Sequence, residues 1–118
     1  MKIRKELAKG STPLLVLGVL ARGEMYGYQI IKTVELESER VFQMNEGTLY
    51  PILHAMEQEG LLCARWEQVE GSARRRKYYR ITDKGRKALA RERAAWDTYR
   101  TAVDRVLGGV QDVTACAY

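Results

Sequence analysis

The pattern of apolar and polar positions in the first third of the chain predicts two helices. Residues 14–20 are almost all aliphatic, and a helix without a polar face belongs at the centre of a core. Thr12 and Pro13 are typical of an N-cap and a first helical position, while Gly23 ends the segment. From Tyr26 to Leu36, apolar residues recur at helical spacing among polar ones, which predicts a second, half-buried helix.

A third helix is predicted from Asn45, a favourable N-cap, to about Gly60. Pro51 leaves two alternatives: the helix begins only at Thr48, or it begins at Asn45 with a local irregularity, which we favour. Just before this helix, the apolar-rich segment 41–44 is predicted to form a brief strand. The positions predicted to face inward are Leu49, Ile52, Leu53 and Met56.

Two later segments, Leu61–Val69 and Arg76–Ile81, contain aromatic residues and are predicted to be strands. Residues 70–73 between them include a glycine and a serine, which are typical of a turn. The two segments therefore predict a β-hairpin with a basic tip.

Thr82 is predicted to cap a final helix that runs to Leu107, where Gly108-Gly109 ends it. Five large apolar residues of this helix form one a/d-like stripe. A small domain cannot cover both sides of a helix of about seven turns, so we expect a partner subunit on the stripe. Packing against the first helix is the alternative. The stripe residues are Leu89, Trp96, Tyr99, Val103 and Val106.

Three helices, a hairpin and a long helix follow one another in the order of a winged helix-turn-helix domain with an added dimerisation helix. The predicted fold class is mainly α (α+β). A chain of 118 residues suits one compact unit. Within this single unit we expect residues 1–82 to form the DNA-binding domain and residues 83–118 to form the C-terminal dimerisation helix and tail. In this fold the third helix enters the major groove, while the hairpin lies on phosphates or in the minor groove.

The charge of the chain is concentrated in the second half of the hairpin and the residues that follow. The total formal charge is +5, but residues 71–87 carry eight basic side chains and one acidic, or +7, which leaves −2 elsewhere. Such a patch favours a polyanion as partner, because cations that neutralise phosphates release counterions. A solvated surface is the alternative. The basic residues are Arg74, Arg75, Arg76, Lys77, Arg80, Lys84, Arg86 and Lys87.

Candidate DNA contacts lie in the third helix and at the hairpin tip. The cations of residues 74–77 are the strongest candidates, because internal packing does not explain such a cluster, and strand alternation lets about half of them reach DNA. Tyr50 is suited to a phosphate contact, or it is a half-buried aromatic residue. Asn45 is alternatively only a cap. The candidates for base contacts are Gln43, Asn45, Thr48 and His54, whose polar groups can read base edges.

Chemistry other than binding has little support in the sequence. His54 is the only histidine and has no nucleophile pattern beside it, so we expect no enzyme activity. Cys63 and Cys116 lie far apart without paired-ligand spacing, so we expect neither a disulfide nor a metal site, and no cofactor. The longest apolar run, residues 13–21, is too short to span a membrane, and the basic start does not resemble a secretory signal. We therefore expect a cytoplasmic protein.

Four motifs follow one another along the chain: Met25-Tyr26-Gly27-Tyr28, Gly47-Thr48-Leu49-Tyr50-Pro51, the segment from Leu53 through Glu59-Gly60-Leu61, and residues 75–85. In these motifs and their spacing the chain resembles the PadR-type transcriptional regulators over nearly its whole length. It looks like the short branch of that family, in which one C-terminal helix replaces a longer domain.

This resemblance implies a bacterial repressor that binds a palindromic operator as a homodimer and is released by an effector. In the short branch the last helix packs with the first helix of the partner, and residues 2–9 suggest a helical arm before Gly10. Some members bind flat aromatic or cationic compounds on a tryptophan of the last helix, and Trp96 has a similar place. Plain packing of Trp96 is the alternative there. For the whole protein, a ligand- or protein-binding winged-helix dimer without an operator is the second hypothesis.

Overall fold

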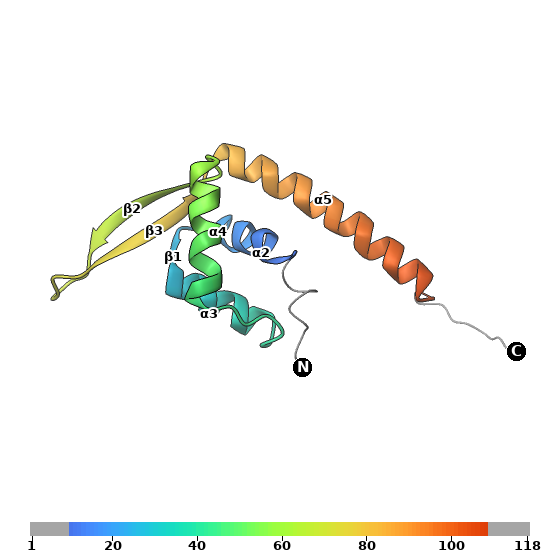
Figure 1. Ribbon diagram of the computed structural model, residues 1–118, viewed down its shortest axis with the longest axis horizontal. Helices are drawn as coiled ribbons and strands as arrows, with labels where there is room; N and C mark the ends of the chain where they lie inside the picture. Colours follow the sequence, from blue (N-terminus) through green and yellow to red (C-terminus); the bar gives the residue numbers. More distant parts are fainter. Residues whose placement is uncertain (1–9, 109–118) are drawn as a thin grey trace, which may run out of the picture.

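The computed structural model describes residues 10–108, and within this range it has four helices and a three-stranded antiparallel sheet (Figure 1). The predicted arm at residues 2–9 and Cys116 lie outside the described residues. The winged helix-turn-helix order with a long C-terminal helix is confirmed. Along the chain the elements are α2 (Thr12–Leu20), β1 (Met25–Tyr26), α3 (Gly27–Glu37), α4 (Glu46–Gln58), β2 (Leu62–Gln68), β3 (Arg75–Ile81) and α5 (Asp83–Val106).

The core lies where α2, α3 and α4 meet the root of the hairpin (Figure 1). α2 is at its centre, as its lack of a polar face predicts, and Val16 and Leu20 are almost fully buried. This helix begins one residue earlier than predicted, because Ser11 and not Thr12 is the N-cap. None of the helices in residues 10–108 combines the length and the apolar character needed to cross a membrane.

α4 begins at Glu46, so the alternative start at Thr48 is wrong. Asn45 caps the helix as predicted: its side-chain oxygen accepts a hydrogen bond of 3.0 Å from the backbone N–H of Thr48. Pro51 lies inside the helix, which continues to Gln58. Leu49, Leu53 and Met56 are buried as predicted, and Ile52 is half-buried against the core.

The third strand comes from a different segment than predicted. Residues 41–44 form no strand; here the Phe42 backbone N–H donates to the Ser38 hydroxyl. Instead Met25–Tyr26 forms β1, which pairs with β3 and places Met25 opposite Tyr79. A strand needs a neighbouring strand to satisfy its backbone groups, and of these two segments only residues 25–26 pair with β3. α3 consequently begins at Gly27, one residue later than predicted.

The junction between the hairpin and α5 is held by Thr82, the predicted cap. Its hydroxyl accepts a hydrogen bond of 3.0 Å from Gly85 N–H and donates to the Gly60 carbonyl at 2.7 Å. A Cβ atom at Gly85 would collide with the Leu61 carbonyl oxygen, so only glycine allows α5 to start this close to β2. The direction in which α5 leaves the core is therefore set at its first turn.

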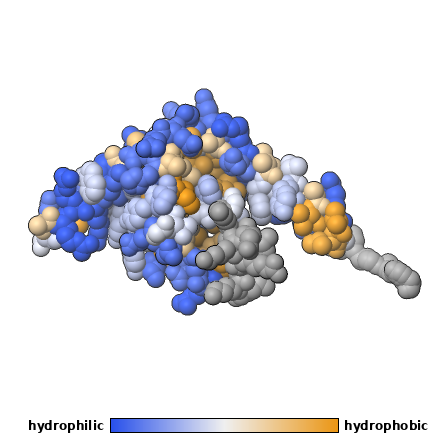
Figure 2. All heavy atoms as spheres, in the orientation of Figure 1, coloured by the Kyte–Doolittle hydropathy of each residue, from blue (hydrophilic) through white to orange (hydrophobic). Residues whose placement is uncertain are grey.

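Beyond its first two turns α5 extends away from the rest of the chain, within a molecule of 69 × 30 × 21 Å (Figure 1). Ala88 is buried and Leu89 packs against the core. The other stripe residues lie farther along, where Trp96 is 42% exposed and Val106 is 86% exposed. The end of α5 carries an apolar patch (Figure 2). This part of the stripe lies on the section of α5 that extends away from the other described elements (Figure 1).

Candidate nucleic-acid interface

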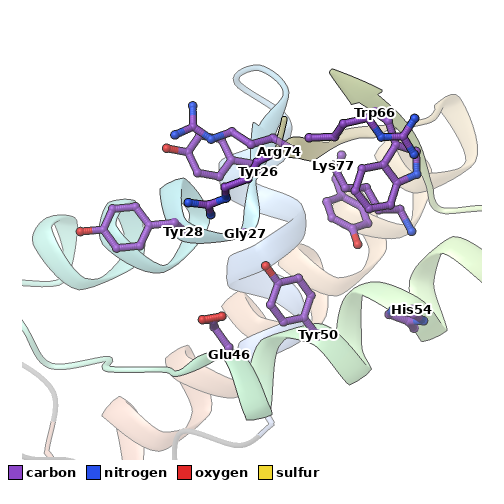
Figure 3. A pocket seen from close by; sticks show the side chains of 12 residues that line it. Tyr26, Gly27, Tyr28, Glu46, Tyr50, His54, Trp66, Arg74 and Lys77 are labelled. Carbon is purple, nitrogen blue, oxygen red and sulfur yellow. The ribbon is translucent and has the colours of Figure 1, made fainter. Parts of the chain in front are cut away.

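A groove of about 730 Å³ runs between the start of α3, one side of α4 and the hairpin (Figure 3). Its walls combine aromatic and basic side chains. Six of the nine predicted DNA contacts line it, namely Tyr50, His54, Arg74, Arg75, Arg76 and Lys77. Three do not, namely Gln43, Asn45 and Thr48. The fold thus brings the wing, which is the hairpin of β2 and β3, and the middle of α4 to one surface.

Tyr50 connects α4 with the start of α3. Its hydroxyl points to Gly27, where a Cβ atom would collide with it (Figure 3). Burial, with a contribution from the charge of Glu46, raises the pKa of Tyr50, so the hydroxyl keeps its proton at neutral pH. At 37% exposure the side chain is half inside the groove and half in solvent. Tyr50 is therefore both a packing residue and a hydroxyl donor facing the groove.

The residues before α4 and in its first turn already have partners within the chain. The Gln43 amide donates a hydrogen bond of 3.2 Å to the Arg40 carbonyl. Arg40 has a φ of 68°, in the left-handed region that favours glycine, so this bond supports a strained loop. Asn45 is the cap of α4, as described above. Of these three predicted base contacts, only Thr48 is exposed with a side chain that makes no hydrogen bond within residues 10–108.

The strand register divides the hairpin side chains between two faces. Trp66 lies opposite Lys77, and Tyr79 follows two residues later on the same face, toward α4. Arg65 lies opposite Tyr78 on the other face. Alternation along β3 places neighbouring Tyr78 and Tyr79 on opposite sides, since Tyr79 is buried while Tyr78 is half-buried against the Tyr26 ring.

On the groove face, Lys77 connects the hairpin to α4. Its ammonium group lies 3.2 Å from the Glu57 carboxylate and also over the rings of Trp66 and Tyr79, at 5.9 and 5.2 Å from the ring centroids. Burial lowers the pKa of Lys77, but the hydrogen bond to Glu57 and the interactions with Tyr79 and with the Glu57 charge together outweigh burial, so the pKa of Lys77 is raised. Lys77 therefore stays charged, with its charge already partnered inside the chain.

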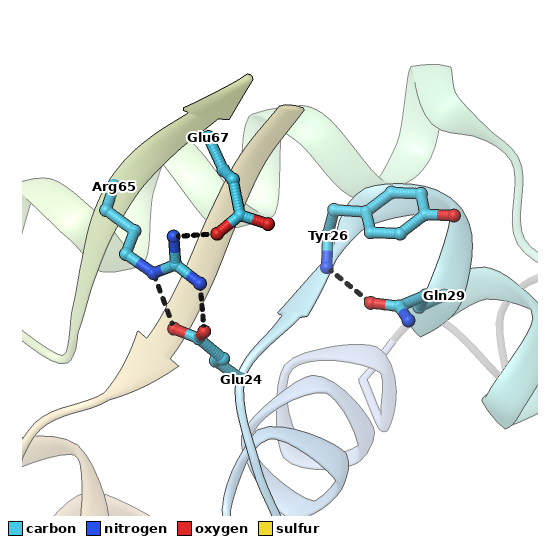
Figure 4. Close-up of polar contacts among 5 residues, drawn as sticks. All are labelled: Glu24, Tyr26, Gln29, Arg65 and Glu67. Carbon is cyan, nitrogen blue, oxygen red and sulfur yellow. Dashed lines mark hydrogen bonds and ion pairs between the residues drawn. The ribbon is translucent and has the colours of Figure 1, made fainter. Parts of the chain in front are cut away.

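On the opposite face, Arg65 is held by two carboxylates (Figure 4). Its guanidinium donates to Glu24 at 3.2 Å and to Glu67 at 2.7 Å, and it lies over the Tyr78 ring. The hydrogen bond from Arg65 holds the pKa of Glu24 below its usual range. Alternation along β2 put Arg65 and Glu67 on one face, a signal available in the sequence. The contact with Glu24 was not predictable, because 41 residues separate it from Arg65.

The tip cations differ from Arg65 and Lys77. Among residues 10–108, no carboxylate lies within ion-pair distance of Arg74, Arg75 or Arg76. Arg75 lies over the Trp66 ring and Arg76 over the Tyr26 ring, with 5.1 and 4.4 Å between guanidinium and ring centroid. Three guanidinium groups per chain are thus open to an external anion.

The described part of the chain has no metal-binding cluster and one free cysteine thiol. Residues 10–108 contain no group of histidine, cysteine or acidic side chains arranged to hold a metal ion. Cys63 is a half-buried free thiol on β2. The groove itself is lined by cations and aromatic rings.

Sequence relatives cover most of the chain. The model of the transcriptional regulator PadR-like family matches residues 16–91. The transcriptional regulator Rv3488 of Mycobacterium tuberculosis is 37% identical over 105 residues, which cover 89% of this chain and 91% of that protein. The negative transcriptional regulator PadR of Bacillus subtilis is 30% identical over 74 residues, which cover 63% of this chain and 40% of that longer protein.

Solved structures agree with these relatives. A PadR family transcriptional regulator from Eggerthella lenta has a TM-score of 0.73 and 34% identity, with 86% of both chains covered. A transcriptional regulator from Clostridium thermocellum has a TM-score of 0.78 and 26% identity, with 87% of this chain and 96% of that chain covered. These relatives are transcriptional regulators and not enzymes. The chain belongs to the PadR-like family of transcriptional regulators.

Proposed function

We propose that this regulator binds a palindromic DNA operator as a homodimer and represses transcription. The observation that carries the proposal is the groove in which three tip arginines without carboxylate partners in residues 10–108 face the same space as Tyr50 and His54 of α4. Free guanidinium groups beside an exposed helix suit a duplex, where phosphates position the protein and base edges give specificity. A relative named as a negative regulator supports repression.

In this proposal α4 enters the major groove and the wing tip lies on the adjacent backbone. Arg74, Arg75 and Arg76 contact phosphates, and Tyr50 donates its hydroxyl to another phosphate. Lys77 contributes less than its charge suggests, because Glu57 already neutralises it. The base contacts come from Thr48 and His54, with Gln43 and Asn45 contributing only where their present hydrogen bonds allow a second partner.

The dimer interface is proposed on the exposed stripe of α5. Trp96, Tyr99 and Val106 are exposed in a single chain, and Val103 is half-buried. Their exposed apolar surface costs roughly 25 cal/mol per Å². A second copy removes that cost and places two wings on the two halves of a palindrome. In this division of labour residues 1–82 bind DNA, and residues 83–118 pair the subunits in the cytoplasm.

A flat aromatic or cationic effector is proposed to bind beside Trp96. The Trp96 and Tyr99 rings lie 6.0 Å apart with 32° between their planes, an arrangement that offers a stacking surface. The Trp66→Phe variant leaves Trp96 as the only tryptophan for fluorescence. A compound that quenches this fluorescence and weakens DNA binding supports the proposal, and a broad panel without any such compound contradicts it.

The whole proposal is tested by fluorescence anisotropy with two duplexes at several salt concentrations. One duplex has random sequence, and the other is taken from upstream of the regulator's own gene. We expect binding to both, tighter to the upstream duplex, with an affinity that falls steeply with salt. The second candidate, a dimer that binds only ligands or proteins, predicts no salt-dependent binding to either duplex. That outcome would show that the groove serves another partner.

A further inference from the structure

Trp66 is a large aromatic residue in an unusual place. It lies near the outer end of β2, 54% exposed, on the hairpin face that looks toward α4. Its strand neighbours Arg65 and Glu67 are charged and form an ion pair on the other face. A tryptophan this exposed gains little from burial, so its contacts on the groove side are the features to explain.

Two cations flank the Trp66 ring. Arg75 lies over it at 5.1 Å and Lys77 at 5.9 Å from the ring centroid. Lys77 is held at its other end by Glu57 of α4, at 3.2 Å. The ring is thus supported through Lys77 by the helix that the proposed function places in the major groove. Its other contact is with Arg75, a cation open to an external anion.

The contact with the Trp66 ring limits the conformational freedom of the Arg75 side chain. An arginine side chain has several rotatable bonds and loses conformational entropy when it binds a phosphate. This entropy loss weakens binding. A guanidinium already lying on an aromatic ring has lost part of that freedom before DNA arrives, and its donors remain available at its edges. Arg75 lies over the Trp66 ring, Lys77 on the same ring is held by Glu57, and no carboxylate of residues 10–108 pairs with Arg75. From these observations we propose that Trp66 is a positioning residue that preorganises Arg75 for phosphate binding.

The neighbouring Arg74 supplies a matched comparison. It has the same charge, lies one residue away in the tip and also lines the groove. No cation–π contact joins it to an aromatic ring within residues 10–108. If Trp66 acts through Arg75, its effect on DNA binding depends on Arg75 and not on Arg74.

The proposal rests on the proposed DNA function, and a double-mutant cycle tests it. The variants are Trp66→Leu, Arg75→Gln and Arg74→Gln, together with Trp66→Leu combined with each arginine change. Affinity for a random duplex is measured at one fixed salt concentration, and thermal unfolding of each variant confirms that it is folded. Trp66→Phe serves as the conservative variant, because it keeps an aromatic face.

We expect Trp66→Leu to weaken binding about fivefold to thirtyfold for a dimer with two wings, from the usual strength of an exposed cation–π contact. In the Arg75→Gln background the same change should cost less than about twofold, while in the Arg74→Gln background the full loss should remain. Trp66→Phe should bind more tightly than Trp66→Leu. The smaller ring offers a weaker cation–π contact, so we expect partial recovery only.

Equal losses from Trp66→Leu in both arginine backgrounds would overturn the positioning role, since Trp66 would then act independently of Arg75. So would a Trp66→Phe variant as weak as Trp66→Leu. These outcomes leave the proposed function intact, because the wild-type protein still binds DNA in them. A folded wild-type protein that binds no duplex would overturn both proposals together.

Discussion

The wing and the outer part of α5 both extend away from the core, yet their surfaces differ in kind (Figure 1). The wing presents guanidinium groups, with Arg75 and Arg76 each stacked on an aromatic ring. The outer α5 presents Trp96 and Val106, both exposed, on the part of the helix that extends away from the other described elements (Figure 1). Charged groups are well solvated, whereas exposed apolar surface costs free energy. The two uncovered surfaces therefore call for different partners, a polyanion at the wing and an apolar protein surface at α5.

The largest effect is expected on α5. The Val103→Glu variant places a carboxylate in the proposed dimer interface. An unpaired buried charge costs about 3 kcal/mol or more, so dimer association should weaken at least about a hundredfold. Thr101→Glu places the same charge on the opposite side of the helix and should leave the dimer intact. Sedimentation velocity at micromolar concentration measures both variants. A wild-type protein that sediments as a monomer would contradict this use of the stripe.

The next effect concerns the wing and its salt dependence. Replacing Arg74 and Arg75 with alanine should weaken binding to operator and random duplex alike, because phosphates carry no sequence information. Each lost phosphate contact lowers the slope of log K against log salt by about 0.9, so up to four contacts per dimer give a change of roughly two to four units.

Arg65→Ala is the control for the wing experiment. It removes a cation from the same hairpin, but from the face where Glu24 and Glu67 hold it. We expect its salt slope to match that of the wild-type protein. If the slope instead falls equally in both variants, the two faces of the hairpin are equivalent toward DNA, and the distinction between free and paired arginines is wrong.

A smaller and more selective effect is expected in α4. Replacing the exposed Thr48 with alanine should weaken binding to the operator by about 1–3 kcal/mol per lost base contact while leaving random duplex nearly unaffected. Gln43→Ala serves as a comparison, since its amide supports the Arg40 carbonyl, and it should lower the melting temperature as well. Parallel anisotropy titrations with both duplexes make the measurement. An equal loss of affinity for both duplexes would show that Thr48 contacts the DNA backbone and not a base edge.

The smallest expected effect is a pH dependence of stability from the Arg65 face. The pKa of Glu24 lies below its ordinary value of 4.5, so its ionised form favours the folded state above about that pH. This contribution is lost as the pH falls through the lowered folded-state value. Glu24→Gln should therefore unfold at a slightly lower temperature than the wild type at neutral pH and converge with it in acid. Glu70→Gln, at an exposed turn position without an ion pair among residues 10–108, should follow the wild type throughout.

Local signals in the sequence were sufficient for most of the fold. Asn45 and Thr82 are caps in the structure because a cap requires only a polar side chain and backbone N–H groups two or three residues away. The hairpin and the long α5 likewise follow from periodicity and turn residues within short windows. The stripe on α5 was predictable for the same reason, as was the concentration of positive charge at the tip.

The sequence by itself therefore determined the order of the elements, their caps and the positions of the charges and apolar stripes, since these depend on neighbours within about one or two helical turns. Only the tertiary structure decided that residues 25–26 and not 41–44 complete the sheet. It also decided which cations are free. Lys77 meets Glu57 and Arg65 meets Glu24 across 20 and 41 residues of chain. Such pairs form only when packing brings distant segments within a few ångströms, so side chains of the same charge differ in whether they have a partner.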